Sequence, residues 1–306
     1  MMKRFFVELA DRSPLFKRLI KLFGLLKGNI LNPQEFPPGH FHSPIPSSHK
    51  IRRNESRIFN IPSYIPSIDL NEIEQIGFLN EFKIYYDSIP FPHKKEEGLR
   101  YFFNNKFYSY SDAIFLYAMI LHSKPKRIIE IGSGFSSCVI LDTNDLHFDN
   151  NIRCTFIEPY PDRLLSLIKK TDLDRIELIN KDIQDIDIEM FRSLSEKDIL
   201  LVDSTHISKT DSDVNYIFFN ILPVLNKGVF IHFHDIFYPF EYPKEWILGG
   251  KSWNEAYILR AFLQYNDSFK IIFFNTYMEH FFKNKFDEDY PLCMENTGGS
   301  IWIKKC

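Results

Sequence analysis

The sequence predicts an α/β fold, in which a mainly parallel sheet carries helices on both faces. From about residue 110 onward, short apolar runs alternate with patterns of helical period, and most of the apolar runs end in polar residues. Such alternation is typical of parallel strands, because each parallel pair needs a long crossover that is usually a helix. The chain has 306 residues, 44% of them hydrophobic and 25% charged, which suits the large core of such a fold.

Five apolar runs are expected to form the parallel part of the sheet. They lie at residues 127–131, 153–157, 176–179, 198–202 and 228–233. Helical patterns accompany them at residues 111–122, 136–146, 161–169, 213–225 and 253–265. Two further runs, 270–274 and 300–304, are separated by a polar segment without a convincing helix, so they predict a terminal antiparallel hairpin.

The first 109 residues lie outside this alternation. Residues 13–27 have the pattern of a basic amphipathic helix, which would pack on the domain or a partner, or bind an anionic membrane peripherally. Many prolines between residues 32 and 68 favour an ordered or semi-ordered arm rather than a helix. The predicted domains are therefore a helix at 1–28, an extension and cap at 29–109, and the α/β domain at 110–306.

The composition argues against several classes of protein. A net charge of −3, with no basic patch interleaved with aromatic residues, argues against a nucleic-acid partner. The four cysteines are scattered, which argues against a disulfide framework and favours a reducing cytoplasm. No run approaches the roughly 18 apolar residues that span a bilayer. We expect a cytoplasmic protein, membrane-associated if the helix at 13–27 binds lipid, and the sequence indicates no oligomeric state.

Polar residues stand where the predicted parallel strands end. In strand order they are Glu130 and Gly132, Glu158, Asp182 and Gln184, Asp203, and His234 with Asp235. Ligands of open α/β sheets bind beyond the carboxyl ends of the strands. We therefore expect these side chains to surround one crevice.

The loop after the first strand reads EIGSGFSS over residues 130–137. Gly132 and Gly134 would allow a tight turn and a close approach of a ligand. Glu158, at the end of the second strand, could accept hydrogen bonds from two ribose hydroxyls. A dinucleotide-binding domain is the main alternative, but its fingerprint expects a further glycine where Ser137 stands.

These motifs resemble those of the class I S-adenosylmethionine-dependent methyltransferases, from about Tyr110 to the C-terminus. The terminal strand GGSIWIKK looks like their antiparallel last strand, and motifs such as GLRYFFNN, FIEPYPDRL and DSTHISKTDSDVNYIFF are similar to a largely uncharacterised bacterial branch. The resemblance implies a Rossmann-like seven-stranded sheet and S-adenosylmethionine as the methyl donor. The cofactor-binding residues that it implies are Glu130, Gly132, Ser133, Gly134, Ser136, Ser137, Glu158, Asp182, Gln184 and Asp203.

A more distant similarity to catechol O-methyltransferase and the metal-dependent sugar O-methyltransferases implies roles for the later strand ends. Asp203 matches their catalytic, metal-binding acid, and His206 matches the general base three positions later. His234 and Asp235 match a pair that completes the metal site. Because Mg²⁺ prefers oxygen ligands, His234 leaves three alternatives: Mg²⁺, an imidazole-tolerant ion such as Mn²⁺, Fe²⁺ or Zn²⁺, or no metal.

The predicted reaction is methyl transfer to the hydroxyl of a small-molecule or glycan acceptor, with His206 taking the hydroxyl proton. The aromatic segment 236–252 would be a lid over the acceptor. The alternatives are a metal-independent methyltransferase, a nicotinamide-dependent oxidoreductase and an idle scaffold. Asn254 and Glu255 are expected to cap the helix that they begin, and His232 is expected to be a core histidine.

Overall fold

The computed structural model describes residues 35–306. The chain divides into two compact units, Met1–Arg57 and Ile58–Cys306. The helix predicted at residues 13–27, and the membrane contact assigned to it, lie outside the described residues. Between residues 35 and 306, no helix is long and apolar enough to cross a membrane.

The proline-rich arm contains helix, so the prediction that excluded one was wrong. Its helices are α3 (Ser48–Arg53) and α4 (Glu55–Ile58). Pro46 and Pro62 bound a stretch without proline, and the Ser47 hydroxyl caps α3 by accepting a hydrogen bond from the Lys50 amide. The prolines therefore limit the length of these helices but do not prevent them.

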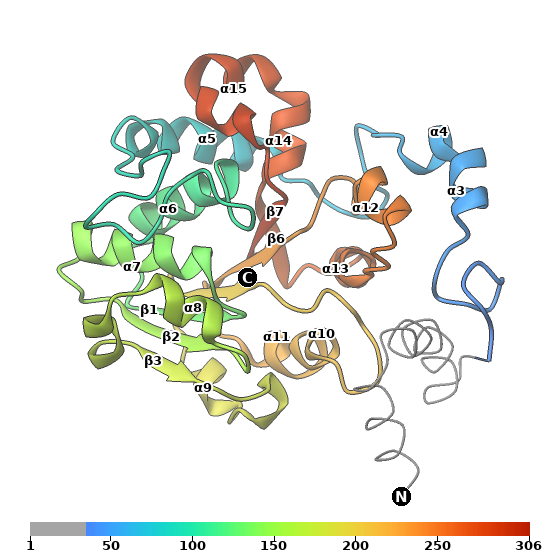
Figure 1. Ribbon diagram of the computed structural model, residues 1–306. Helices are drawn as coiled ribbons and strands as arrows, with labels where there is room; N and C mark the ends of the chain where they lie inside the picture. The colour runs from blue at the N-terminus through green and yellow to red at the C-terminus, as the bar shows by residue number, and fades with distance from the viewer. Residues whose placement is uncertain (1–34) are drawn as a thin grey trace, which may run out of the picture. The chain divides into compact units, whose positions relative to one another are not determined.

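A seven-stranded sheet forms the centre of the second unit (Figure 1). Its strands are β1 (Arg127–Ile131), β2 (Arg153–Ile157), β3 (Glu177–Ile179), β4 (Ile199–Val202), β5 (Phe230–His234), β6 (Phe269–Phe274) and β7 (Ser300–Lys305). The order is β3-β2-β1-β4-β5-β7-β6. Within it, the first five strands along the chain, β1 through β5, pair with one another in parallel. β7 runs antiparallel to both of its neighbours, which confirms the predicted sheet and its antiparallel last strand.

Helices cover the sheet on both faces, with α6 and α7 on one face in Figure 1 and α10 and α11 on the other. The longer helices are α5 (Glu72–Tyr86), α6 (Ser111–Ser123), α7 (Phe135–His147) and α13 (Glu255–Leu263). The shorter ones include α8 (Asp162–Leu167), α9 (Glu189–Arg192), α10 (Asp213–Tyr216), α11 (Leu222–Val224) and α12 (Lys244–Leu248). A π-helical turn, Ile217–Ile221, joins α10 to α11 within the single helix that the sequence predicted at 213–225.

Strands β6 and β7 form the predicted antiparallel pair, but the segment that connects them is helical, contrary to the prediction. It contains α14 (Asn275–Phe281), α15 (Lys283–Asp289) and the 3₁₀ helix η4 (Pro291–Glu295), and β7 inserts between β5 and β6. Phe282, Phe286 and Tyr290 lie four residues apart, and the last two are fully buried. This apolar spacing stabilises a helix whose other positions are polar, which is why the segment looked like a loop.

Helix α5 was not predicted, yet it belongs to the same core. Its Leu79 and Phe82 are fully buried, and α5 packs against α6 and β6. The Gln75 side chain accepts a hydrogen bond from the Phe274 amide at the end of β6, at 2.8 Å. Residues before the α/β alternation therefore help to hold the sheet edge.

Candidate functional site

Two cavities open at the carboxyl ends of the parallel strands, each with a volume of about 660 Å³. Asp203, Ser204 and Thr205, which follow β4, line both of them. The loops after β1 and β4 are fastened together, because the Asp203 amide donates to the Ile131 carbonyl at 2.8 Å. The two cavities therefore meet at the end of β4.

The first cavity gathers predicted residues from four strand ends. Those that line it are Gly132, Glu158, Asp182, Gln184 and Asp203. Its volume lies within the usual range for small-molecule sites. The Gln184 side-chain amide donates to the Asp211 carbonyl at 2.7 Å, which links the turn after β3 to the loop after β4. The predicted single crevice is therefore two adjoining cavities, because His234 and Asp235, at the end of β5, line the second cavity and not the first.

Gly132 is required by the packing of the loop itself. Its φ is +77°, and a Cβ at this position would lie 2.0 Å from the Asp203 carbonyl oxygen. Gly134 has an extended backbone, with φ 175°, and a Cβ there would meet only Arg163 Cδ, at 3.3 Å. Gly132 is therefore required, because the loop after β4 leaves no room for a side chain at this position. The steric requirement for glycine at position 134 is weaker.

Five of the predicted cofactor residues are buried and line neither cavity: Glu130, Ser133, Gly134, Ser136 and Ser137. Ser137 Oγ accepts a hydrogen bond from the Gly134 amide at 3.0 Å and donates one to the Glu130 carboxylate. These two hydrogen bonds hold the glycine loop in its conformation. Burial raises the pKa of Glu130 to about 8, although the Ser136 and Ser137 hydroxyls oppose it. Glu130 Oε1 and Ser133 Oγ have no hydrogen-bond partner among residues 35–306, so both could serve a ligand or water.

Backbone amides orient the carboxylate of Glu158. Its Oε2 accepts from the Ser133 amide at 3.1 Å, and its Oε1 accepts from the Tyr160 amide at 2.8 Å. Each carboxylate oxygen can accept a second hydrogen bond. Glu158 is therefore fixed at the cavity wall with acceptor capacity to spare, as the ribose-binding role requires.

Where the cavities meet, acids and histidines alternate in a chain of five side chains. Glu255 Oε2 lies 2.8 Å from His206 Nδ1, and His206 Nε2 lies 3.4 Å from Asp203 Oδ1. Asp203 Oδ1 lies 3.3 Å from His234 Nδ1, whose Nε2 lies 3.5 Å from Asp112 Oδ2. We call Glu255, His206, Asp203, His234 and Asp112 the acid–histidine chain.

Asp235 lies beside the acid–histidine chain, 3.6 Å from His206 Nε2 and 3.8 Å from His234 Nδ1. The predicted metal ligands Asp203, His234 and Asp235 therefore come together. However, within residues 35–306 no group of three or more His, Cys, Asp or Glu side chains is arranged to hold a metal ion. Each of the two imidazoles faces three carboxylates instead.

The carboxylates keep both histidines protonated. Burial alone would lower the pKa of His206, but Asp203 and Glu255 outweigh it and raise that pKa to about 10. Burial likewise opposes the charge on His234, yet Asp235, Asp203 and Asp112 raise its pKa well above the usual value. Burial disfavours the Asp203 carboxylate, but the two histidines more than compensate and lower its pKa. At neutral pH the unliganded site thus pairs imidazolium with carboxylate.

Two functional candidates were missed in the sequence. Asp112 stands at the start of α6 and not at a strand end, and its carboxylate accepts from the Gly299 amide just before β7, at 3.1 Å. Asn254 is the N-cap residue of α13, as expected, although its side chain makes no capping hydrogen bond, whereas the Glu255 side chain contacts His206. Polar residues at the start of a helix are usually interpreted as caps. The sequence therefore did not reveal that Glu255 contacts His206, 49 residues away.

The start of α13 holds the loop after β4 in place. The His206 carbonyl accepts from the Asn254 and Glu255 amides at 3.0 and 3.2 Å, and the Asn254 side chain accepts from the Ser208 amide at 2.6 Å. His206 itself has a φ of +60°, a left-handed conformation that is costly for a residue other than glycine. These contacts therefore maintain a strained position that aims the imidazole at Asp203.

His232 is a core histidine, as expected. It is fully buried, its Nε2 lies 3.3 Å from the Tyr108 hydroxyl, and burial lowers its pKa to about 3. Its other nitrogen, Nδ1, has no hydrogen-bond partner within the described part of the chain. This residue stays neutral at physiological pH and lies behind His234, outside both cavities.

The second cavity combines an acidic floor with aromatic walls and a basic rim. The floor contains Asp112, Asp203, His206, His234 and Asp235, the walls contain Phe107, Phe237, Trp246 and Trp253, and the rim contains Lys106, Arg163 and Lys251. Phe237, Trp246 and Lys251 come from the segment that the sequence predicted as a lid. This cavity can accommodate a ring and present polar groups at both of its ends.

Comparison with known proteins relates the chain to methyltransferases. Residues 129–236 match a family model described as a methyltransferase domain. A protein of Archaeoglobus fulgidus, described only as uncharacterized, is 39% identical over 168 residues, which are 53% of this chain and 74% of that protein.

Two solved structures are similar at low sequence identity. The S-adenosylhomocysteine-bound methyltransferase PaMTH1 of Podospora anserina is 16% identical, with a TM-score of 0.43, over 87% of this chain and all of that one. The O-methyltransferase TomG of Streptomyces achromogenes is 12% identical, with a TM-score of 0.41, over 85% and 96%.

Proposed function

The chain belongs to the class I S-adenosylmethionine-dependent methyltransferases, and from this premise we propose that it methylates a hydroxyl oxygen of a small-molecule or glycan acceptor. This membership argues against the nicotinamide-dependent oxidoreductase. The observation that carries the proposal is the meeting of two cavities at Asp203, Ser204 and Thr205. A methyl donor in the first cavity and an acceptor in the second would meet at the end of β4.

The residues of the first cavity fit an adenosyl ligand. Glu158 would accept hydrogen bonds from the ribose hydroxyls, because both of its oxygens are oriented by amides and retain free lone pairs. Asp182 and Gln184 would lie along the adenine.

When bound, S-adenosylmethionine supplies a methyl group that its sulfonium already activates for displacement. The protein's main task is then alignment, which can contribute about 7–11 kcal/mol to a two-reactant step. The shared Asp203 places a carboxylate where a positively charged donor meets the acceptor. The aromatic walls of the second cavity would hold the acceptor ring in line.

His206 is the residue that we propose receives the acceptor proton. Glu255 holds its Nδ1, so its Nε2 is directed toward Asp203 and Asp235 at the cavity floor. The resting imidazole is protonated on both nitrogens, so Nε2 must first give up its proton, and the recipient that we propose is Asp235, 3.6 Å away, because burial raises the pKa of that carboxylate whereas the pKa of Asp203 is lowered. Nε2 can then take the hydroxyl proton as the methyl–oxygen bond forms.

The predicted metal ion does not fit the arrangement of these residues. Asp203, His234 and Asp235 come together, but among residues 35–306 no group of three or more His, Cys, Asp or Glu side chains is arranged to hold a metal ion. We therefore derive no step through a metal and favour the metal-independent alternative. Equal turnover with EDTA and with added Mn²⁺ would agree with this, and a large gain with Mn²⁺ would contradict it.

A direct test combines binding with turnover. Calorimetric titration should show binding of S-adenosylmethionine and S-adenosylhomocysteine but not of NAD, and Glu158→Gln should weaken both adenosyl ligands. Labelled methyl transfer to a panel of phenols and sugars then tests the acceptor class. Folded protein that binds neither adenosyl ligand would refute the proposed function.

A further inference from the structure

Three basic side chains around the second cavity have no acidic partner. Lys106 precedes α6, Arg163 lies on α8, and Lys251 follows α12. All three are exposed, and none forms an ion pair with a carboxylate among residues 35–306. Exposed lysines elsewhere, such as Lys83 and Lys283, do pair with an aspartate one turn away. The charge on this rim is therefore available to a ligand.

Aromatic rings support two of these cations over the cavity. Lys251 Nζ lies 3.5 Å from the ring centre of Trp246 and 4.2 Å from that of Trp253. Arg163 Cζ lies 4.0 Å from the ring centre of Phe107. Cation–π contacts position a charge without neutralising it, unlike an ion pair. The rim is thus a set of charges held in place by the walls of the cavity.

The buried side of the cavity is acidic, because Asp112 is buried and Asp203 and Asp235 are half-buried, whereas the three basic side chains are exposed. A ligand in this space meets carboxylates and imidazoles where the cavity is buried and unpaired cations where it is exposed. Such a polarised cavity favours a molecule that donates a hydrogen bond at one end and carries negative charge at the other. The aromatic residues between the ends suit a ring.

We propose that the methyl acceptor is an anionic hydroxy compound, a ring that bears a carboxylate or phosphate opposite its reacting hydroxyl. This inference rests on the proposed function, since it identifies the second cavity as the acceptor site. The anionic group contacts the rim formed by Lys106, Arg163 and Lys251. The hydroxyl at the other end of the ring faces Asp203 and His206.

Tryptophan fluorescence provides a test that needs no turnover. The chain has three tryptophans: Trp246 and Trp253 line the cavity, and Trp302 is fully buried in β7. Protein loaded with S-adenosylhomocysteine is titrated with two matched pairs, 3,4-dihydroxybenzoate against 3,4-dihydroxybenzamide and glucose 6-phosphate against glucose. The charged member of at least one pair should bind about tenfold or more tightly than its neutral partner. The pair that shows this preference distinguishes a carboxylate from a phosphate.

Variants then locate the charge preference. Lys251→Gln and Arg163→Gln should each reduce the preference severalfold, whereas Lys251→Arg should retain it. Lys305→Gln is the matched control, because Lys305 lies over the Phe269 ring at 4.3 Å but outside the cavity. Raising the salt concentration should also reduce the preference, since exposed charges are screened.

Equal binding of charged and neutral members in both pairs, or a preference that the Lys251 and Arg163 variants leave unchanged, would overturn the inference. A loss of cofactor affinity in Arg163→Gln without any change in the preference would assign that arginine to the cofactor and would count against it. Failure of the proposed function has a different signature, because it abolishes binding of the adenosyl ligand before any acceptor is added.

Discussion

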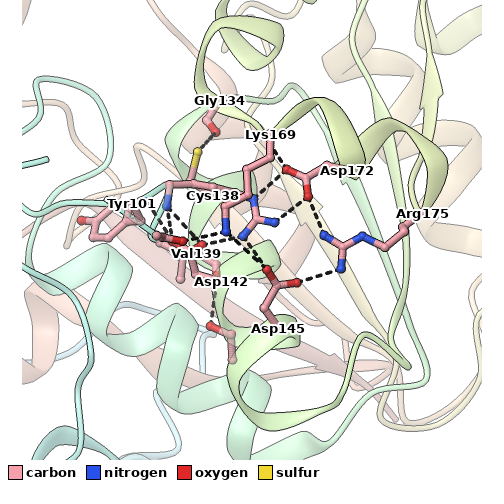
Figure 2. A network of polar contacts seen from close by, with 12 residues as sticks. Tyr101, Gly134, Cys138, Val139, Asp142, Asp145, Lys169, Asp172 and Arg175 are labelled. Carbon is pink, nitrogen blue, oxygen red and sulfur yellow. Dashed lines mark hydrogen bonds and ion pairs between the residues drawn. The ribbon is translucent and has the colours of Figure 1, made fainter. Parts of the chain in front are cut away.

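Two networks of charged side chains in this protein differ in the spacing of their groups and in the ratio of cations to carboxylates. Around Arg100, the labelled carboxylates Asp142, Asp145 and Asp172 point toward the guanidinium from α7 and from the 3₁₀ turn after α8 (Figure 2). Their closest contacts are 2.5 to 2.9 Å, and Arg175 adds further contacts to Asp145 and Asp172. Lys169 lies 3.8 Å from Asp145, so the network has three cations for its three carboxylates.

The acid–histidine chain differs in both balance and spacing. Apart from the pair formed by Glu255 and His206, its groups lie 3.3 to 3.5 Å apart, and with Asp235 its carboxylates outnumber its histidines. It also lines the second cavity, whose lining contains no residue of the Arg100 network. A closed, balanced network fixes structure, whereas an open network with surplus negative charge can bind or exchange protons with a ligand. The comparison therefore assigns stability to the first network and chemistry to the second.

Breaking the Arg100 network should have the largest effect on stability. Arg100→Met would leave Asp142 and Asp172 buried without their main cation, so we expect the free energy of unfolding to fall by about 3–5 kcal/mol. Urea denaturation measures this change. The control, Lys83→Met, breaks an exposed pair with Asp87 and should cost less than about 1 kcal/mol. Equal losses in the two variants would refute the structural role of the Arg100 network.

Breaking the acid–histidine chain should instead reduce turnover. Asp203→Asn removes the one charge that contacts both histidines and both cavities, so methyl transfer should fall by about 10²–10³-fold. Initial rates with labelled S-adenosylmethionine measure the loss, and circular dichroism checks the fold. Asp174→Asn, at an exposed position outside both cavities, is the control. Wild-type rates in Asp203→Asn would remove the end of β4 from the mechanism.

A milder change in the same chain should sharpen the assignment. Glu255→Gln keeps the shape of the side chain that contacts His206 but removes its charge, so we expect the turnover number to fall about 10–100-fold. The affinity for S-adenosylhomocysteine should not change, because Glu255 does not line the first cavity. If instead cofactor affinity falls while turnover is preserved, Glu255 supports the loop and does not position the imidazole.

The last prediction concerns the pH dependence of stability. Burial raises the pKa of Glu130 to about 8, so the unfolded chain releases this proton at lower pH than the native one. The native state therefore loses stability as pH rises from about 4.5 to 8, by at most about 1.4 kcal/mol per pH unit. Denaturation at several pH values should show a flatter slope in Glu130→Gln. A slope that is unchanged in this variant would contradict the prediction.

The sequence by itself determined the parallel strands, the glycine loop and the acids at the strand ends. Strand bounds follow from short apolar runs, and β1 and β2 match the predicted bounds residue for residue. The convergence of Gly132, Glu158 and Asp203 follows from a topological rule, because the carboxyl ends of parallel strands share one edge. Local pattern and connectivity were sufficient for these features.

Only the tertiary structure decided which other side chains join the residues at the strand ends to form the site. Glu255 lies 49 residues from His206, and Asp112 and Arg163 belong to helices whose patterns indicate only surface or capping roles. The helices between β6 and β7 and helix α5 were also hidden, because a few apolar side chains that pack against distant parts of the chain stabilise them. Pairings of this kind depend on distances across the folded chain, which a one-dimensional pattern does not contain.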